Sequence, residues 1–214
     1  MPVQMITLVQ IEKLRESVAS VLSEKRMKHT LAVEDMAYRL GSIYFQDEEV
    51  LLLLRAAALL HDVTKELPDE EQLAILESYS VKPLPEELAS MPTIHVLTAA
   101  LVIPKRFPEF ADPRVIDAVR YHTTGREGMS VFEKIIFLAD YIDDTRTYPS
   151  CISLRDEFFS AKPEKMNEVE RIRHLDRAAL DSIENTLSYL QSKERSIHPL
   201  TLEARTDLNA RLGK

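Results

Sequence analysis

The stretch of residues 48–61 constrains the fold of this chain more than any other part of its sequence. It contains two glutamates at its start and one arginine, Arg55, and every other residue before His61 is apolar. A helix that is apolar around its whole circumference belongs in the middle of a helical bundle, and this one is too short to span a bilayer. The polar pair His61-Asp62 follows directly, so these side chains emerge from the most buried element of the expected fold.

Other segments carry apolar residues at helical spacing and can surround this central helix. Asp112-Pro113 and a capping box from Ser130 to Glu133 are typical helix starts, and we expect Gly41 and Pro104 to end helices. The expected helices cover residues 11–22, 29–40, 69–79, 92–103, 113–122, 131–143 and 164–193, the last with a break near His174, and the tail after Pro199 reads as irregular or a short helix. Strand patterns are nearly absent, so we predict an all-α bundle in a single domain over residues 1–214.

Composition and charge exclude several classes of protein. The 214 residues have a formal net charge of −8, so we expect no nucleic-acid partner, although local cations and metal ions can still bind a phosphate substrate. The first ten residues lack the features of a signal peptide, and no segment predicts a membrane partner. The single cysteine, Cys151, suits a reducing compartment, and we therefore expect a cytoplasmic location.

Four histidines and two aspartates lie at or beside the ends of the expected apolar helices. Imidazole and carboxylate together suit Fe, Mn, Zn or Ni rather than Ca, and a carboxylate can bridge two metals because each oxygen can bind one of them. Each residue alone is more often a helix cap or a core residue, but buried charge is costly unless it is paired or metal-bound. We therefore predict two metal ions with Asp62 as the bridge, one ion on His29, His61, Asp62 and Asp140 and the other on Asp62, His95 and His122.

These residues resemble the ligand pattern of the HD-domain superfamily of metal-dependent phosphohydrolases, and more narrowly the YqeK family. The matching stretches are residues 26–31 (RMKHTL), 59–65 (LLHDVTK), 122–125 (HTTG) and 129–140 (MSVFEKIIFLAD), with Arg146 and Leu154-Arg155 beyond them. The resemblance implies a core of residues 22–155 followed by a helical extension over residues 164–214. The chain departs from the family pattern at Asp143-Asp144, where a Glu-Pro pair is expected, and at Ser150, where a glycine is usual.

The resemblance implies a symmetrical bis(5'-nucleosyl)-tetraphosphatase with a di-iron centre. Such an enzyme hydrolyses diadenosine tetraphosphate (Ap4A) to two ADP molecules, and carrying the family pattern over by position selects the same six metal ligands. The family also favours a homodimer. A hydroxide between the metals would attack an inner phosphorus, with Asp62 and Lys65 as catalytic residues. The residues expected to bind the substrate are Arg26, Lys65, Thr123, Thr124, Gly125, Arg126 and Arg146.

Other functions remain open on the sequence alone. The same centre could serve a nucleotide monophosphatase or a dNTP hydrolase, which a panel of nucleotides would separate by product. A non-catalytic nucleotide sensor would bind nucleotide without turnover, and a purely structural bundle would bind no metal. A cyclic dinucleotide phosphodiesterase is disfavoured because the chain has no Gly-Tyr-Pro sequence.

Overall fold

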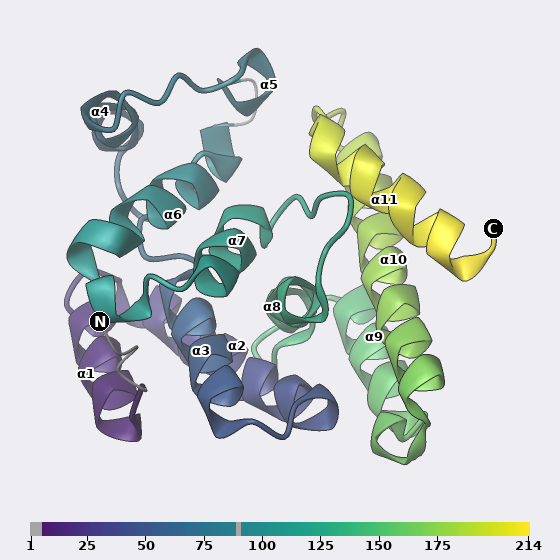
Figure 1. The fold of residues 1–214 in the computed structure, drawn as a ribbon. Helices are drawn as coiled ribbons and strands as arrows, with labels where there is room; N and C mark the ends of the chain where they lie inside the picture. Colours follow the sequence, from purple (N-terminus) through teal and green to yellow (C-terminus); the bar gives the residue numbers. More distant parts are fainter. Residues whose placement is uncertain (1–5, 89–90) are drawn as a thin grey trace.

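Helices make up the regular structure of the computed structural model, which describes residues 6–88 and 91–214 and has no strand among them. The predicted all-α fold is therefore confirmed. The signal-peptide prediction concerned residues 1–10, of which residues 1–5 lie outside the described residues. Figure 1 shows the arrangement of α1 (Leu8–Ala19), α2 (Glu24–Tyr44), α3 (Glu48–Leu60), α4 (Asp69–Ser78), α5 (Pro85–Leu88), α6 (His95–Arg106), α7 (Pro113–Tyr121), α8 (Val131–Ile142), α9 (Pro149–Ser160), α10 (Glu168–Ser192) and α11 (Pro199–Leu212), with 3-10 turns at Met91–Thr93, Pro108–Phe110 and Pro163–Lys165.

Short capping motifs set the start of the helices around the candidate site. The Ser130 hydroxyl accepts a hydrogen bond from the Glu133 backbone N–H, and the Glu133 carboxylate accepts one from the Ser130 N–H at 2.9 Å. Asp112 caps α7, with Pro113 as its first residue. These interactions satisfy donors that the helix itself cannot pair, so both predicted starts are confirmed.

The apolar helix α3 occupies the middle of the molecule, as its sequence requires. It contacts α1, α2, α7 and α8, and residues 52–54 and 56–60 are buried. The prediction that Gly41 ends a helix is wrong, because α2 continues to Tyr44. A Cβ atom at Gly41 would lie 2.5 Å from Leu54 Cδ1, so the glycine instead allows α2 to approach α3 closely.

Other helices also differ from the prediction in their bounds, and α1 and α2 begin three and five residues earlier than expected. Pro104 does not end α6, which continues for two more residues to Arg106. The proline removes one helical hydrogen bond, because it has no backbone N–H, and the helix ends soon afterwards. No break occurs at His174, because its ring stacks on Phe158 and its Nε2 donates to the Phe158 carbonyl at 3.0 Å while α10 continues. The tail after Pro199 forms the 14-residue helix α11, and α9 has no counterpart in the predicted set.

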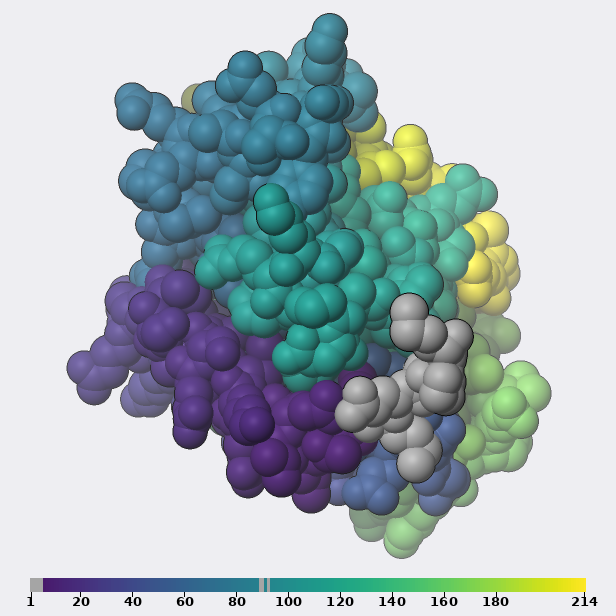
Figure 2. All heavy atoms as spheres, turned by 60° about the vertical axis from the view of Figure 1, so that its left-hand side comes forward, coloured from purple at the N-terminus to yellow at the C-terminus, as the bar shows by residue number. Residues whose placement is uncertain are grey.

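Three clusters of buried apolar residues hold the described helices together, and the third, Leu76, Ile94 and Leu97, joins α4 to the start of α6. Of the other two cores, the larger contains residues of α1 to α3 and α6 to α10. The smaller joins α8, α10 and α11 through buried residues such as Phe137, Ile183 and Leu208, and Figure 1 shows α11 crossing α10 at one side of the molecule. Figure 2 shows the blue segment with α4 and α5 at the top of another face, above the purple N-terminal helices. The division into a core and a C-terminal extension stays a prediction.

Among the described residues, every helix is too short or too polar to cross a membrane.

Candidate metal centre

The predicted ligands come from five helices that the fold brings to one point. His29 lies in the second turn of α2 and Asp140 in the last turn of α8. The other four lie at helix ends: His61 caps the C-terminus of α3 and Asp62 follows it, His95 begins α6, and His122 caps the C-terminus of α7. The five residues other than Asp140 are buried, and the Asp140 side chain is one-fifth exposed at 20%.

The helix ends also fix the orientation of two histidine rings. His61 Nδ1 lies 2.6 Å from the Ala58 carbonyl oxygen, and His122 Nδ1 lies 2.8 Å from the Val119 carbonyl oxygen. A carbonyl can only accept, so each Nδ1 is the protonated donor. Each Nε2 is therefore the nitrogen that faces the site and is placed to bind a metal ion.

Asp62 lies at the centre of this ligand group, with its two oxygens facing different histidines. Oδ1 lies 3.1 Å from His95 Nε2 and 3.7 Å from His122 Nε2. Oδ2 lies 3.4 Å from His61 Nε2 and 3.9 Å from His29 Nε2. A carboxylate placed in this way can contribute one oxygen to each of two ions.

Two groups of side chains could hold a metal ion. His29, His61 and Asp140 form one, and His61, Asp62 and His122 form the other, with the donor atoms of each group within 4.8 Å of one another. His95 belongs beside the second group, because its Nε2 lies 3.3 Å from His122 Nε2. The structure thus brings together all six predicted ligands. His61 lies in both groups of donor atoms, whereas the sequence predicted it as a ligand of the first ion only.

The donor atoms also fit a metal ion on grounds that are independent of the family resemblance. His61 Nε2 is buried and has no hydrogen-bond partner among the described residues, which is costly for a polar atom unless a metal binds it. Burial alone would raise the pKa of the Asp62 and Asp140 carboxyls, but the histidines around Asp62, and Arg146 with two histidines around Asp140, together outweigh it and hold both pKa values well below their usual range. Imidazole nitrogens together with ionised carboxylates fit a transition-metal ion.

Asp143 supports the ligand group from behind and was missed as a functional residue. This fully buried carboxylate lies 3.3 Å from His29 Nδ1, while Asp140 Oδ1 lies 3.0 Å from His29 Nε2. Burial lowers the pKa of His29, but Asp140 and Asp143 outweigh burial and raise the pKa to about 9. A carboxylate at the outer nitrogen orients a ligand histidine, and the position of Asp143 one turn after Asp140 could have indicated this role.

Three of the predicted substrate-binding residues lie against the ligand group. Arg26 Nη1 contacts Asp62 Oδ2 at 2.8 Å, and Lys65 Nζ lies 3.1 Å from His95 Nδ1. Arg146 Nη2 contacts Asp140 Oδ1 at 2.5 Å. We call them the site cations: Arg26, Lys65 and Arg146. Burial, offset in part by Asp62 and Asp140, lowers the pKa of Lys65.

The other predicted substrate-binding residues make no hydrogen bond or ion pair to the ligand group within the described chain. Arg126 instead pairs with Asp117 at 2.9 Å and Glu133 at 2.6 Å. Thr124 is buried and its hydroxyl donates to the Gly125 carbonyl, while Thr123 is half-buried. Gly125 has a φ of 65°, and a Cβ atom added at this position would lie 3.1 Å from the Cβ of Ala204. These contacts are structural, and substrate binding by the four residues remains a prediction.

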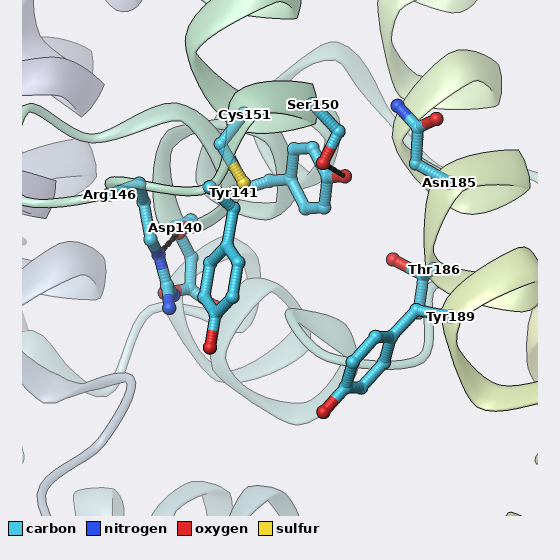
Figure 3. Close-up of a pocket in the computed structure, with 9 residues that line it drawn as sticks. Asp140, Tyr141, Arg146, Ser150, Cys151, Asn185, Thr186 and Tyr189 are labelled. Carbon is cyan, nitrogen blue, oxygen red and sulfur yellow. Dashed lines mark hydrogen bonds and ion pairs between the residues drawn. The ribbon is translucent and has the colours of Figure 1, made fainter. Parts of the chain in front are cut away.

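A cavity of about 240 Å³ opens beside Asp140. Figure 3 shows Asp140 and Arg146 on one side of it and Asn185, Thr186 and Tyr189, from α10, on the opposite side. The remaining lining residues come from the end of α8 and the start of α9: Tyr141, Tyr148, Ser150 and Cys151. No local sequence pattern indicates this cavity, because it joins segments that are far apart along the chain.

An all-helical bundle with a buried His/Asp ligand group of this order is the arrangement of an HD domain, and the HD-domain family model matches residues 26–145. Symmetrical bis(5'-nucleosyl)-tetraphosphatases are similar over most of their length. The Bacillus subtilis (strain 168) protein is 30% identical, covering 84% of this chain and 87% of its own, and the Halalkalibacterium halodurans protein is 32% identical, covering 85% and 87%.

A solved structure from Clostridium acetobutylicum, described as a predicted HD superfamily hydrolase involved in NAD metabolism, has a TM-score of 0.81. It is 32% identical, and the match covers 97% of this chain and 100% of that one. The present chain belongs to the HD-domain superfamily of metal-dependent phosphohydrolases and, within it, to the YqeK family.

Proposed function

We propose that this protein hydrolyses Ap4A symmetrically to two ADP molecules at the His/Asp centre. The observation that carries the proposal is the complete ligand group around Asp62, in a chain whose relatives are named for this reaction. A degenerate HD module that only senses nucleotide would not need six intact ligands. This favours an enzyme over a sensor or a purely structural bundle.

The proposed cofactor is a pair of divalent ions, with iron favoured by the family and Mn, Zn or Ni compatible with the donors. The six predicted ligands would hold it. When bound, such ions supply Lewis acidity to water and to phosphate oxygens. Asp62 would be shared between the ions, since its two oxygens face different histidines.

The charge of the site explains how an acidic protein can bind a polyphosphate. The three site cations balance the three nearby carboxylates of Asp62, Asp140 and Asp143. Each divalent ion therefore adds net positive charge where the tetraphosphate must bind. Arg26 and Arg146 offer planar guanidinium groups, which suit phosphate oxygens, and Lys65 adds a point charge beside His95.

The decisive experiment combines anaerobic purification, metal analysis and a product assay with Ap4A. We expect bound transition metal and ADP as the only nucleotide product. Equal amounts of ATP and AMP would contradict symmetrical cleavage. A panel with dNTPs, AMP, dAMP and NAD would identify the reaction if Ap4A remains intact, NAD being included because of the description of the Clostridium relative.

A variant of one ligand tests whether the centre performs the reaction. His122→Ala removes an Nε2 donor beside Asp62, so we expect turnover to be lost while the helical content is retained. His198→Asn is the matched control, because His198 caps α11 and asparagine is also a good cap. Full activity in His122→Ala would refute its assignment to the centre.

The proposal extends to a reducing, cytoplasmic setting, since the one cysteine is a buried free thiol. It also includes a homodimer, which the family resemblance favours and which sedimentation analysis would test.

A further inference from the structure

The cavity beside Asp140 is continuous with the candidate metal centre through two shared residues. Asp140 is both a metal ligand candidate and part of the cavity wall, and Arg146 lines the cavity while binding Asp140 through its Nε and Nη2 atoms. Arg146 Nη1 makes no hydrogen bond within the described part of the chain, and its side chain is about one-third exposed at 32%. A phosphate that leaves the metal centre in this direction would meet a free guanidinium edge.

Three tyrosines line the cavity and suit it to a flat, heteroaromatic group, and Tyr189 lies on the side opposite Asp140. Tyr189 is 47% exposed and Tyr148 is 64% exposed, and Tyr141 is held at the cavity by a hydrogen bond from its hydroxyl to Ser150 Oγ at 3.3 Å. Exposed aromatic rings beside a cavity provide stacking surfaces for a base. Asn185 adds an amide that can both donate and accept, as the N6/N7 edge of adenine requires.

We propose that this cavity is the subsite for one nucleoside of the substrate, with Tyr189 stacking against the base and Asn185 facing its polar edge. The inference deepens the proposed function and rests on it for the identity of the substrate. The order of residues from the metal ligands to Arg146 and then to Tyr189 matches the order of diphosphate and nucleoside in an ADP half.

The size of the cavity limits it to one half of a dinucleotide. Its volume of about 240 Å³ lies below the range of roughly 300–1,000 Å³ that is typical of pockets for drug-sized ligands. One nucleoside fits this scale and two do not. Such a site would therefore bind a free nucleoside diphosphate as well as one end of Ap4A.

Binding of ADP to the metal-loaded full-length protein tests the subsite, with inorganic pyrophosphate as the probe that lacks a base. In isothermal titration calorimetry, Tyr189→Ala is expected to weaken ADP binding about tenfold or more, because a base loses its stacking partner. Tyr189→Phe keeps the ring and should stay within about twofold of the wild type. Pyrophosphate binding should be the same in all three proteins.

The matched control is Tyr38→Ala, since Tyr38 is 45% exposed and lies on α2, outside the cavity. This variant should bind ADP as the wild type does. Asn185→Ala provides a second test from the same wall and should weaken ADP binding without changing pyrophosphate binding. Unchanged ADP affinity in Tyr189→Ala would overturn the subsite, and so would equal losses for ADP and pyrophosphate, which would indicate a displaced helix.

The outcomes separate this inference from the proposed function. A wild-type protein that cleaves Ap4A, with an unchanged KM in Tyr189→Ala, would refute the subsite alone. A protein that binds ADP through Tyr189 but leaves Ap4A intact would refute the hydrolase and retain the subsite.

Discussion

A buried ion pair fastens the C-terminal helices to the helix that carries Asp140. Lys134 on α8 forms a salt bridge with Asp176 on α10, and the two residues are only 1% and 5% exposed. Asp176→Ala would leave a lysine ammonium buried without its partner. Breaking a buried pair in this way costs about 3–5 kcal/mol, a large share of the roughly 5–15 kcal/mol that stabilises a typical domain.

Urea denaturation followed by far-UV circular dichroism measures this loss. The double variant Lys134→Met/Asp176→Leu removes both charges and fills similar space, so it should recover most of the stability. The control is Glu184→Ala, which breaks the exposed Arg205–Glu184 pair between α10 and α11 and should cost under about 1 kcal/mol. The reasoning fails if Asp176→Ala costs no more than this control, or if the double variant is as unstable as the single one.

Three further predictions concern the centre and its supports. Lys65→Ala should lower turnover but retain metal content by elemental analysis, and loss of metal would indicate a structural role instead. Asp143→Ala should weaken metal binding by about 10- to 100-fold in a metal titration, whereas its 65% exposed neighbour Asp144, replaced by alanine, should leave it unchanged. Gly125→Ala should lower the unfolding free energy by about 1–2 kcal/mol because of the positive φ, and an unchanged thermal midpoint would contradict this.

The sequence was sufficient for the fold class and for the grouping of the six candidate side chains in space, while their role as metal ligands stays a prediction. The apolar helix before His61 had to be central, and His95, His122 and Asp140 lay at comparable places near the ends of other apolar helices. Their convergence follows from packing α7 and α8 against α3, and α6 against α7. What the pattern could not give was the position of His61 Nε2 close to both groups of donor atoms, because that depends on the exact positions of side chains from several helices.

The errors have a different physical cause, which is that tertiary contacts override local signals. Gly41 reads as a helix end but lies within α2, where the closeness of Leu54 decides its identity. Arg126, whose predicted substrate contact stays a prediction, shows the same effect of tertiary contacts, because it lies beside a threonine-rich turn and pairs with Asp117 and Glu133. Both partners of Arg126 come from helices on either side of that turn, and no local pattern indicated the pairing.

The candidate metal ligands and the proposed base-binding residues lie on different helices. We therefore expect the chemistry at the metal and the choice of substrate to depend on different parts of the chain. All six ligand candidates lie within residues 29–140, in or at the ends of helices that contribute to the larger core. The proposed base-binding residues Asn185 and Tyr189 lie on α10, which the smaller core and the Lys134–Asp176 pair hold against α8. Substitutions on this face of α10 would therefore alter which nucleotide binds without disturbing the metal ligands, whereas loosening α10 would weaken nucleotide binding and leave the metal in place.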